Sequence, residues 1–204
     1  MTEQQHYYSS NPIVQHELNS WSYDLRGHHF TFTTDNGVFS KNRVDYGSRV
    51  LIDNVELVDL PSGDLLDLGT GYGPLGITLA TELPDRQIEM VDINERAVEL
   101  AQQNAANNQV NNVKIHVSDI YDQVPNTQFA AIITNPPVRA GKKVVDAMIA
   151  GAYDHLTTGG RLTVVLQKKQ GAPSAQKLME QVFGNCRILK RSKGYYILES
   201  IKED

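Results

Sequence analysis

The sequence is poor in cysteine and contains no long apolar run. Its single cysteine, Cys186, cannot form an internal disulfide or a cysteine-rich metal site, and we expect it to be a small core residue. No stretch approaches the roughly 18 apolar residues that a membrane-spanning helix needs. The start of the chain, MTEQQHYYSS, lacks the basic and apolar regions of a secretory signal. These absences predict a cytoplasmic protein that binds neither a membrane nor a metal.

Charge is distributed unevenly along the chain. The formal net charge of -5 argues against a protein that simply coats nucleic acid. Between Arg139 and Lys193, however, 11 basic residues stand against 3 acidic ones. This basic third is either the footprint of a phosphate-rich partner or a set of scattered, solvated side chains. The charge pattern alone leaves both interpretations open.

The length of 204 residues and the hydrophobic content of 40% are typical of one globular domain with a full α/β core. The composition changes near residue 60. Before that point the sequence predicts strands at 21–26 and 28–34, a turn at 35–37 and a helix over 44–57. We interpret residues 1–60 as an N-terminal cap that is too small to be a separate domain. Residues 61–204 then form the main compact unit.

Strands and helices alternate regularly in this main unit. The predicted strands lie at 64–68, 87–91, 113–117, 129–134 and 161–167, and the predicted helices between them at 75–83, 97–106 and 143–155. This alternation predicts an α/β fold: a Rossmann-like, doubly wound and mainly parallel sheet with helices on both faces. A further helix at 174–183 precedes strands at 187–191 and 195–200, and the short segment between these strands predicts a C-terminal antiparallel hairpin.

A glycine-rich loop follows the first strand of the main unit. Gly69, Gly71 and Gly73 alternate with other residues, and Pro74 suits the first turn of a helix. Such a loop at the carboxyl end of a strand lets a polar ligand approach the backbone, although a plain tight turn is the alternative. Gly71, Gly73 and Gly76 also match the dinucleotide fingerprint, so a nicotinamide-dependent oxidoreductase is a second interpretation.

Acidic residues end the strands around this loop. Asp67 lies at the end of the first strand, Asp92 closes the second, and Asp119 follows the third. An ionised carboxylate accepts hydrogen bonds from both hydroxyls of a ribose, which suits Asp92, and Asp119 can accept from the exocyclic amine of a purine. The alternative for each is a local cap of a helix or a loop.

The fourth strand ends in Asn135, Pro136 and Pro137. A residue before proline is held extended, and prolines offer carbonyl oxygens without amide protons. The side-chain oxygen of Asn135 and the carbonyl of Pro136 can together accept both hydrogens of a planar amine and turn its lone pair toward an electrophile. This arrangement suits methyl transfer to nitrogen, whereas hydride transfer has no obvious use for it. A proline-rich turn is the alternative, but the position at a carboxyl strand end beside the glycine loop disfavours it.

Together these motifs resemble the class I S-adenosylmethionine-dependent methyltransferases. More narrowly, nearly the whole chain resembles the small-domain family that includes the bacterial 16S rRNA guanine-N2 methyltransferases, and the segments 35–40 (DNGVFS) and 45–48 (DYGS) resemble the signature upstream of that domain. The resemblance implies that residues 61–204 are the methyltransferase domain and that Asn135, Pro136 and Pro137 are catalytic. It places S-adenosylmethionine against Asp67, Gly69, Gly71, Gly73, Asp92, Ile93, Ser118, Asp119 and Asn135, with Phe39, Ser40 and Gly47 closing over it.

The implied reaction is methylation of the exocyclic N2 of a guanine in 16S rRNA, as free RNA or within the small ribosomal subunit. The target base must be single-stranded or flipped, because N2 is out of reach inside a helix. Members that modify rRNA often have an aromatic residue after Asn-Pro-Pro, whereas Val138 stands there in this chain. Basic residues follow the fourth and fifth strands, and we expect RNA contacts from Arg139, Lys142, Lys143, Lys168 and Lys169.

Alternative functions come from more than one class. The acceptor could be a protein glutamine amide or a tRNA base, with the same chemistry. The protein could also be the nicotinamide-dependent oxidoreductase named above. A third alternative is a catalytically silent, cofactor-binding module that assists ribosome assembly, although the intact Asn-Pro-Pro sequence argues against it.

Overall fold

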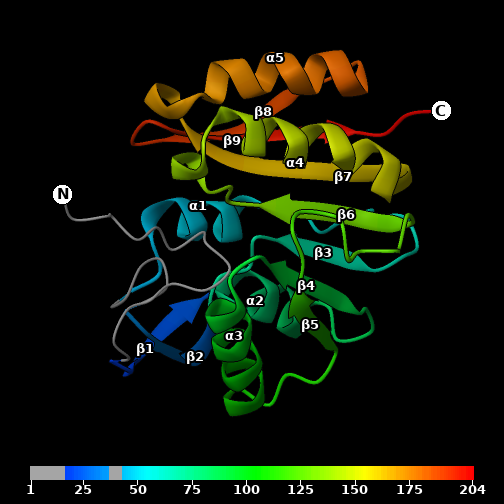
Figure 1. Ribbon diagram of the computed structural model, residues 1–204. Coiled ribbons are helices and arrows are strands. Elements are labelled where there is room, and N and C mark those ends of the chain that lie inside the picture. Colours follow the sequence, from blue (N-terminus) through cyan, green and yellow to red (C-terminus); the bar gives the residue numbers. More distant parts are fainter. Residues whose placement is uncertain (1–16, 37–42) are drawn as a thin grey trace.

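Seven strands form the central sheet of the protein. The computed structural model describes residues 17–36 and 43–204 (Figure 1). The strands of this sheet are β3 (Leu65–Leu68), β4 (Ile88–Asp92), β5 (Val113–Val117), β6 (Phe129–Thr134), β7 (Leu156–Gln167), β8 (Arg187–Ser192) and β9 (Tyr195–Ile201). Their order across the sheet is β5-β4-β3-β6-β7-β9-β8. The pairs from β5 to β7 are parallel, whereas β9 is antiparallel to both β7 and β8.

Helices cover both faces of this sheet (Figure 1). They are α1 (Tyr46–Asn54), α2 (Pro74–Glu82), α3 (Glu95–Asn107), α4 (Lys142–His155) and α5 (Ala172–Phe183). One apolar core lies between the sheet and α1, α2 and α3, and a second lies between the sheet and α4 and α5. The doubly wound, mainly parallel arrangement confirms the predicted α/β fold class.

The inner strands are the ones whose sequences are continuous apolar runs. β3 and β6 are buried at every position, as expected in a parallel sheet that is covered on both faces. The edge strand β5 is only partly buried. The chain runs from β3 to β4 and β5 on one side and then crosses to β6 on the other. This reversal of strand order creates a crevice outside the carboxyl ends of β3 and β6, which is where ligands bind in such folds.

A separate two-stranded hairpin precedes the sheet. Its strands are β1 (Asn19–Leu25) and β2 (His28–Thr34). Side chains of α3 bond the outer edge of β2: the Asn104 amide accepts from the Thr33 nitrogen at 2.7 Å and donates to the Thr33 oxygen at 2.9 Å. Asn108, the residue directly after α3, makes the same pair of bonds to Thr31. Asn104 also donates to the backbone carbonyl oxygen of Tyr72 at 2.8 Å, which ties the hairpin to the loop after β3.

The first helix is shorter than the sequence predicts. The apolar spacing predicts a helix over 44–57, and the helix spans only Tyr46–Asn54. Asp45 caps its N-terminus by accepting a hydrogen bond from the Ser48 nitrogen at 3.1 Å, and the chain is extended again at Val55. β7 is longer than predicted, because it begins at Leu156, directly after α4.

The predicted C-terminal antiparallel hairpin is confirmed as β8 and β9. Lys193 and Gly194 form its turn with φ angles of 45° and 82°, the left-handed values that a two-residue hairpin turn requires. Cys186 lies just before β8, where it is partly buried and packs against the core on the α4 and α5 side. Within residues 17–36 and 43–204, no helix is long and apolar enough to cross a membrane.

Candidate active site

A cavity of about 470 Å³ lies at the carboxyl ends of β3, β4 and β6. Its volume falls within the range of about 300–1,000 Å³ that is typical of small-molecule sites. The glycine loop after β3 and the Asn-Pro-Pro segment after β6 both line this one crevice. Its polar and glycine lining includes Asp45, Ser48, Gly69, Gly71, Tyr72, Asp92, Ser118, Asp119, Asn135, Arg139, Gln167 and Tyr195. Pro136, Pro137, Ile93 and Val138 belong to its apolar lining.

The glycines of the loop have different surroundings. Gly71 has a φ of 59°, and a side-chain carbon added there would meet no atom within 4 Å, so its backbone is open to the cavity. An added carbon at Gly73 would lie only 2.9 Å from Ile77 and 3.2 Å from Met90. Gly73 therefore permits close packing of α2 and does not line the cavity. Its predicted cofactor contact stays a prediction.

Asp67 is buried behind the loop and does not line the cavity. Its Oδ2 accepts hydrogen bonds from the Thr70 hydroxyl at 2.6 Å and from the Gly76 nitrogen at 2.9 Å. These bonds tie the loop to the first turn of α2. Burial raises the pKa of the Asp67 carboxyl to about 7, although both hydrogen bonds act in the opposite direction. We infer that Asp67 supports the loop, and its direct contact with a ligand stays a prediction.

This raised pKa leads to a pH-dependent stability. Between the ordinary value of 3.8 and about 7, the folded protein binds a proton at Asp67 that the unfolded chain does not bind. The free energy of unfolding should therefore fall as the pH rises through this window, and this contribution should level off above it. The Asp67→Asn variant cannot titrate at this position. Its free energy of unfolding, relative to that of wild type, should therefore increase as the pH rises through this window. Urea unfolding at several pH values tests this, and parallel pH curves for the two proteins would contradict it.

Asp92 joins the glycine loop to the start of α3. Its Oδ2 accepts from the Gly71 nitrogen at 2.8 Å and its Oδ1 from the Asn94 nitrogen at 2.9 Å. Asn94 in turn caps α3 by accepting from two backbone amides. Burial raises the pKa of Asp92, and its backbone hydrogen bonds lower it. A carboxylate offers about four lone-pair sites, so these bonds orient Asp92 and still leave acceptor capacity for a ligand.

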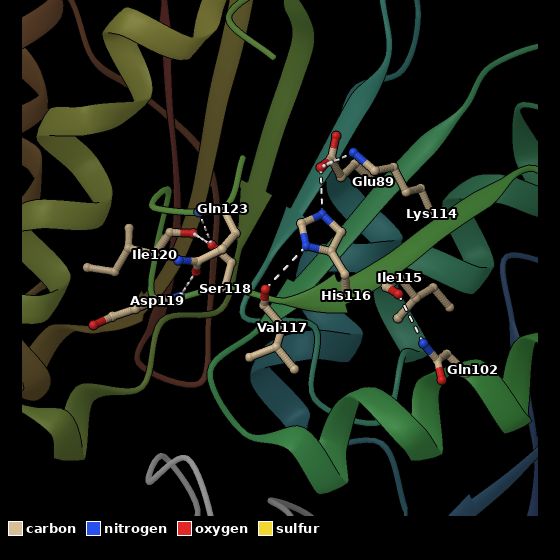
Figure 2. A network of polar contacts seen from close by, with 10 residues as sticks. All are labelled: Glu89, Gln102, Lys114, Ile115, His116, Val117, Ser118, Asp119, Ile120 and Gln123. Atoms are coloured by element: carbon tan, nitrogen blue, oxygen red, sulfur yellow. Dashed lines mark hydrogen bonds and ion pairs between the residues drawn. The ribbon is translucent and has the colours of Figure 1, made fainter. Parts of the chain in front are cut away.

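Asp119, in the loop after β5, lines the cavity. Figure 2 shows the hydrogen bonds of this loop. The Ser118 hydroxyl donates to the Ile120 oxygen at 2.9 Å and accepts from the Gln123 nitrogen at 3.1 Å. The Gln123 side chain accepts from the Asp119 nitrogen at 3.0 Å. These bonds fix the backbone, while in Figure 2 the Asp119 side chain points away from the network. Among the residues that the structure describes, none forms a hydrogen bond or ion pair with this exposed carboxylate.

The same strand is held to its neighbour by a buried acid. Glu89 on β4 accepts from His116 Nε2 at 2.7 Å and from Lys114 Nζ at 2.9 Å, both on β5 (Figure 2). Glu89 is 4% exposed, so it is a nearly desolvated carboxylate with two partners. This cluster fixes the edge strand whose end carries Asp119.

Asn135 is oriented by two residues of the α1 N-terminus. Its Nδ2 donates to the Ser48 hydroxyl at 2.9 Å and contacts Asp45 Oδ1 at 3.4 Å. An ionised carboxylate only accepts hydrogen bonds, so the amide nitrogen must face Asp45. The Asn135 Oδ1 is consequently left to accept from a ligand. The strand end itself is anchored because the Thr134 hydroxyl donates to the Leu68 oxygen at 2.7 Å.

Sequence reasoning did not select Asp45, Ser48, Tyr72 or Tyr195, which all line the cavity. It selected Gly47, which is buried beside them but does not line the cavity. A side-chain carbon at Gly47 would lie 2.8 Å from the Tyr195 ring. The predicted cofactor contacts of Phe39 and Ser40 lie outside the described residues. The signal for Asp45 was its capping position three residues before Ser48.

The five residues expected to contact RNA lie at different distances from the cavity. Arg139 lines it. Lys142 forms an ion pair with Asp146 on the next turn of α4. Three are exposed but outside the cavity lining: Lys143, Lys168 and Lys169. Their contacts with RNA stay a prediction.

The sheet order, the glycine loop and the cavity at the switch point define a class I S-adenosylmethionine-dependent methyltransferase. Residues 29–199 match the model of the family described as methyltransferase small domain. The chain therefore belongs to this family.

Two relatives are similar to nearly the whole of this chain. The chain is 50% identical over 199 residues to the uncharacterized protein YbxB of Bacillus subtilis, covering 97% of this chain and 98% of that protein. It is 30% identical to ribosomal RNA small subunit methyltransferase C of Vibrio cholerae, over 93% of this chain and 54% of that protein. The chain thus spans about half the length of that ribosomal RNA methyltransferase.

A solved structure has the same fold. The 16S rRNA N2 G1207 methyltransferase (RsmC) of T. thermophilus, in complex with AdoMet and guanosine, superposes with a TM-score of 0.81 at 26% identity. The match covers 94% of this chain and 52% of that one.

The residues of the cavity fit S-adenosylmethionine. Tyr72 lines the cavity, and its buried hydroxyl has no hydrogen-bond partner in the described part of the chain. Burial raises its pKa, so it stays a neutral donor. An orphaned donor, the open backbone at Gly71 and the acceptors Asp92 and Asp119 match a ligand with a carboxylate, a ribose and a purine amine. We propose that Asp92 would bind the ribose and Asp119 the purine amine.

Proposed function

We propose that this methyltransferase modifies the exocyclic N2 of a guanine in 16S rRNA. The observation that carries the proposal is the orientation of Asn135, whose Nδ2 is held by Ser48 and Asp45 so that its Oδ1 can accept from an amine. The T. thermophilus relative is named for methylation of a guanine N2, and its structure contains guanosine. Both facts support guanine as the acceptor. A catalytically silent module would have no use for an oriented acceptor of this kind.

S-adenosylmethionine, when bound, supplies an electrophilic methyl carbon. The chain supplies the orientation of the nucleophile: Asn135 Oδ1 and the Pro136 carbonyl accept the two amine hydrogens, which directs the nitrogen lone pair into the cavity. The acceptor amine is neutral, so no strong base is required before transfer. After transfer, the nitrogen releases its proton to water held at Asn135 or to bulk solvent. Positioning therefore provides much of the acceleration.

Asp45 should act on this reaction through Asn135. The Asp45→Ala variant removes the carboxylate that sets the amide orientation and should lower kcat by about tenfold, the equivalent of one hydrogen bond to a charged group. The Asp45→Asn variant retains an oxygen at this position and should restore most of kcat. Because Asp45 also caps α1, thermal unfolding must be measured alongside kcat and the cofactor dissociation constant. A fall in stability with an unchanged kcat would assign Asp45 a purely structural role.

Methyl transfer from labelled S-adenosylmethionine tests the acceptor. The wild-type protein is incubated with 16S rRNA, small ribosomal subunits, tRNA and a release-factor protein that contains a glutamine acceptor. We expect label in the rRNA or the subunit, and N2-methylguanosine after digestion to nucleosides. Label confined to tRNA or to protein would overturn the proposal, and the loss of one rRNA methylation in a deletion strain would locate the modified nucleotide.

A further inference from the structure

Two tyrosines from distant parts of the chain meet at the edge of the cavity. Tyr46 is the first residue of α1 and Tyr195 is the first residue of β9. Their ring centroids lie 5.6 Å apart with an interplanar angle of 51°. The Tyr46 hydroxyl bonds the Ser192 hydroxyl at 2.7 Å, which fixes the helix to the β8–β9 hairpin. Tyr195 lines the same cavity as Asn135, and both rings are only partly buried.

Two cations lie against the Tyr46 ring of this pair. The Arg49 guanidinium and the Lys193 ammonium each lie 5.0 Å from the centroid of the Tyr46 ring. Lys193 is exposed in the hairpin turn. The backbone nitrogen of Lys168 donates to the backbone oxygen of Gly194 at 2.8 Å, so the exposed residue Lys168 lies beside that turn. We call Tyr46, Arg49, Lys193 and Tyr195 the tyrosine mouth.

Two acids near the tyrosine mouth, Asp45 and Asp53, form no ion pair with Lys193 among the residues that the structure describes. Asp45 faces Asn135 and is engaged in capping α1. The Tyr23 hydroxyl, to which Arg49 donates, raises the pKa of the Arg49 guanidinium most, and Asp53 raises it further. Lys193 has neither a salt bridge nor a hydrogen bond from its ammonium within the part of the chain that the structure describes, so its charge faces solvent.

Contacts with the backbone of α1 and pairing with β7 hold Tyr195 in place. The carbon that alanine would add at Gly47 would lie 2.8 Å from the Tyr195 Cε1, which means that the ring rests directly on the backbone at the start of α1. Tyr195 also pairs with Gln167 of β7, another residue of the cavity wall. The ring is therefore held in place before any ligand arrives.

We propose that Tyr195 is the surface on which the acceptor base stacks and that the tyrosine mouth admits a single strand of RNA. The proposal rests on the function proposed above and identifies the route of its substrate. Aromatic rings beside solvent-facing cations are the combination that binds single-stranded nucleic acid, because bases stack on the rings and phosphates pair with the cations. The Tyr195 ring also provides an aromatic surface in a chain that has Val138 directly after Asn-Pro-Pro.

Substitutions at Tyr195 separate stacking from packing. The Tyr195→Phe variant retains the ring, whereas Tyr195→Leu retains apolar bulk over Gly47 without a π face. With a fluorescent single-stranded RNA that carries a central guanosine, Tyr195→Leu should weaken binding by about tenfold or more, and Tyr195→Phe should bind like wild type. Both variants should bind S-adenosylmethionine within about twofold of wild type, which also reports that they are folded. Equal RNA affinity of Tyr195→Leu and wild type would overturn the stacking role.

Charge reversal tests the route of the strand. Lys193→Glu should weaken RNA binding and reduce the slope of log affinity against log salt by about 0.7 for each phosphate that the protein no longer neutralises. The matched control is Lys177→Glu, which reverses an exposed charge on α5, on the opposite face of the sheet from α1. Equal effects of the two reversals would overturn the proposed route.

The outcomes for the two proposals are distinguishable. If wild type methylates rRNA and the Tyr195→Leu and Lys193→Glu variants do so with an unchanged KM for RNA, the proposed role of the tyrosine mouth is wrong and the function stands. If wild type binds no RNA and methylates only a protein glutamine, both proposals fall.

Discussion

Replacement of Asn135 by alanine is expected to lower kcat for methyl transfer by about 10²- to 10³-fold, the effect of removing one oriented hydrogen-bonding group from a transition state. The side chain lies at the end of β6, and its amide is oriented by Ser48 at 2.9 Å and by Asp45 at 3.4 Å. Without its Oδ1, one amine hydrogen has no acceptor in the cavity and the lone pair is no longer directed. The loss should therefore appear in kcat.

The dissociation constant for S-adenosylmethionine provides the control for this variant. The acceptors that we assign to the cofactor, Asp92 and Asp119, belong to other strands, so binding measured by calorimetry should change by less than about threefold. The Asn135→Asp variant is a sharper probe, because its carboxylate would face the Asp45 carboxylate at the distance now occupied by the amide nitrogen. We expect it to be as inactive as the alanine variant. A kcat near wild type in the alanine variant would show that groups other than Asn135 orient the amine that receives the methyl group.

The sequence was informative where chemistry depends on neighbouring residues. The glycine loop, the strand-end acids and the Asn-Pro-Pro segment are contiguous motifs, and in a parallel sheet the carboxyl ends of adjacent strands must meet. The fold class and the order of the elements followed from apolar runs such as β3 and β6, which are buried throughout. Boundaries were less accurate, because a cap such as Asp45 or a turn ends an element within one residue.

The sequence could not show contacts between distant segments. Asn135 and Ser48 are 87 residues apart, and the contact depends on how α1 packs against β7 and β9. Tyr195 reaches the cavity through the same packing and through the absence of a side chain at Gly47. For the same reason the motif alone could not separate Gly69 and Gly71, which line the cavity, from Gly73, which packs against Ile77 and Met90. Residue type fixes what a group can do, whereas tertiary packing decides what it faces.

Replacement of Asp92 by alanine should weaken S-adenosylmethionine binding by about a hundredfold, roughly 3 kcal/mol, because it removes two functions of one carboxylate. Asp92 accepts from the Gly71 nitrogen at 2.8 Å and from the Asn94 nitrogen at 2.9 Å. We also assign to it the hydroxyls of the ribose. The variant therefore loses an acceptor for the cofactor and releases the loop that faces it.

Asparagine should not rescue this position. Both carboxylate oxygens of Asp92 accept from backbone N–H groups, so an amide must place its own NH₂ against one of these donors. We expect Asp92→Asn to bind the cofactor nearly as weakly as Asp92→Ala, in contrast to the rescue expected for Asp45→Asn. Asp85→Ala is the matched control, because it removes an exposed acid from the loop before β4, at the opposite end of the same strand. Calorimetric titration of the three variants decides the matter, and wild-type affinity in Asp92→Asn would show that this carboxylate neither holds the loop nor binds the cofactor.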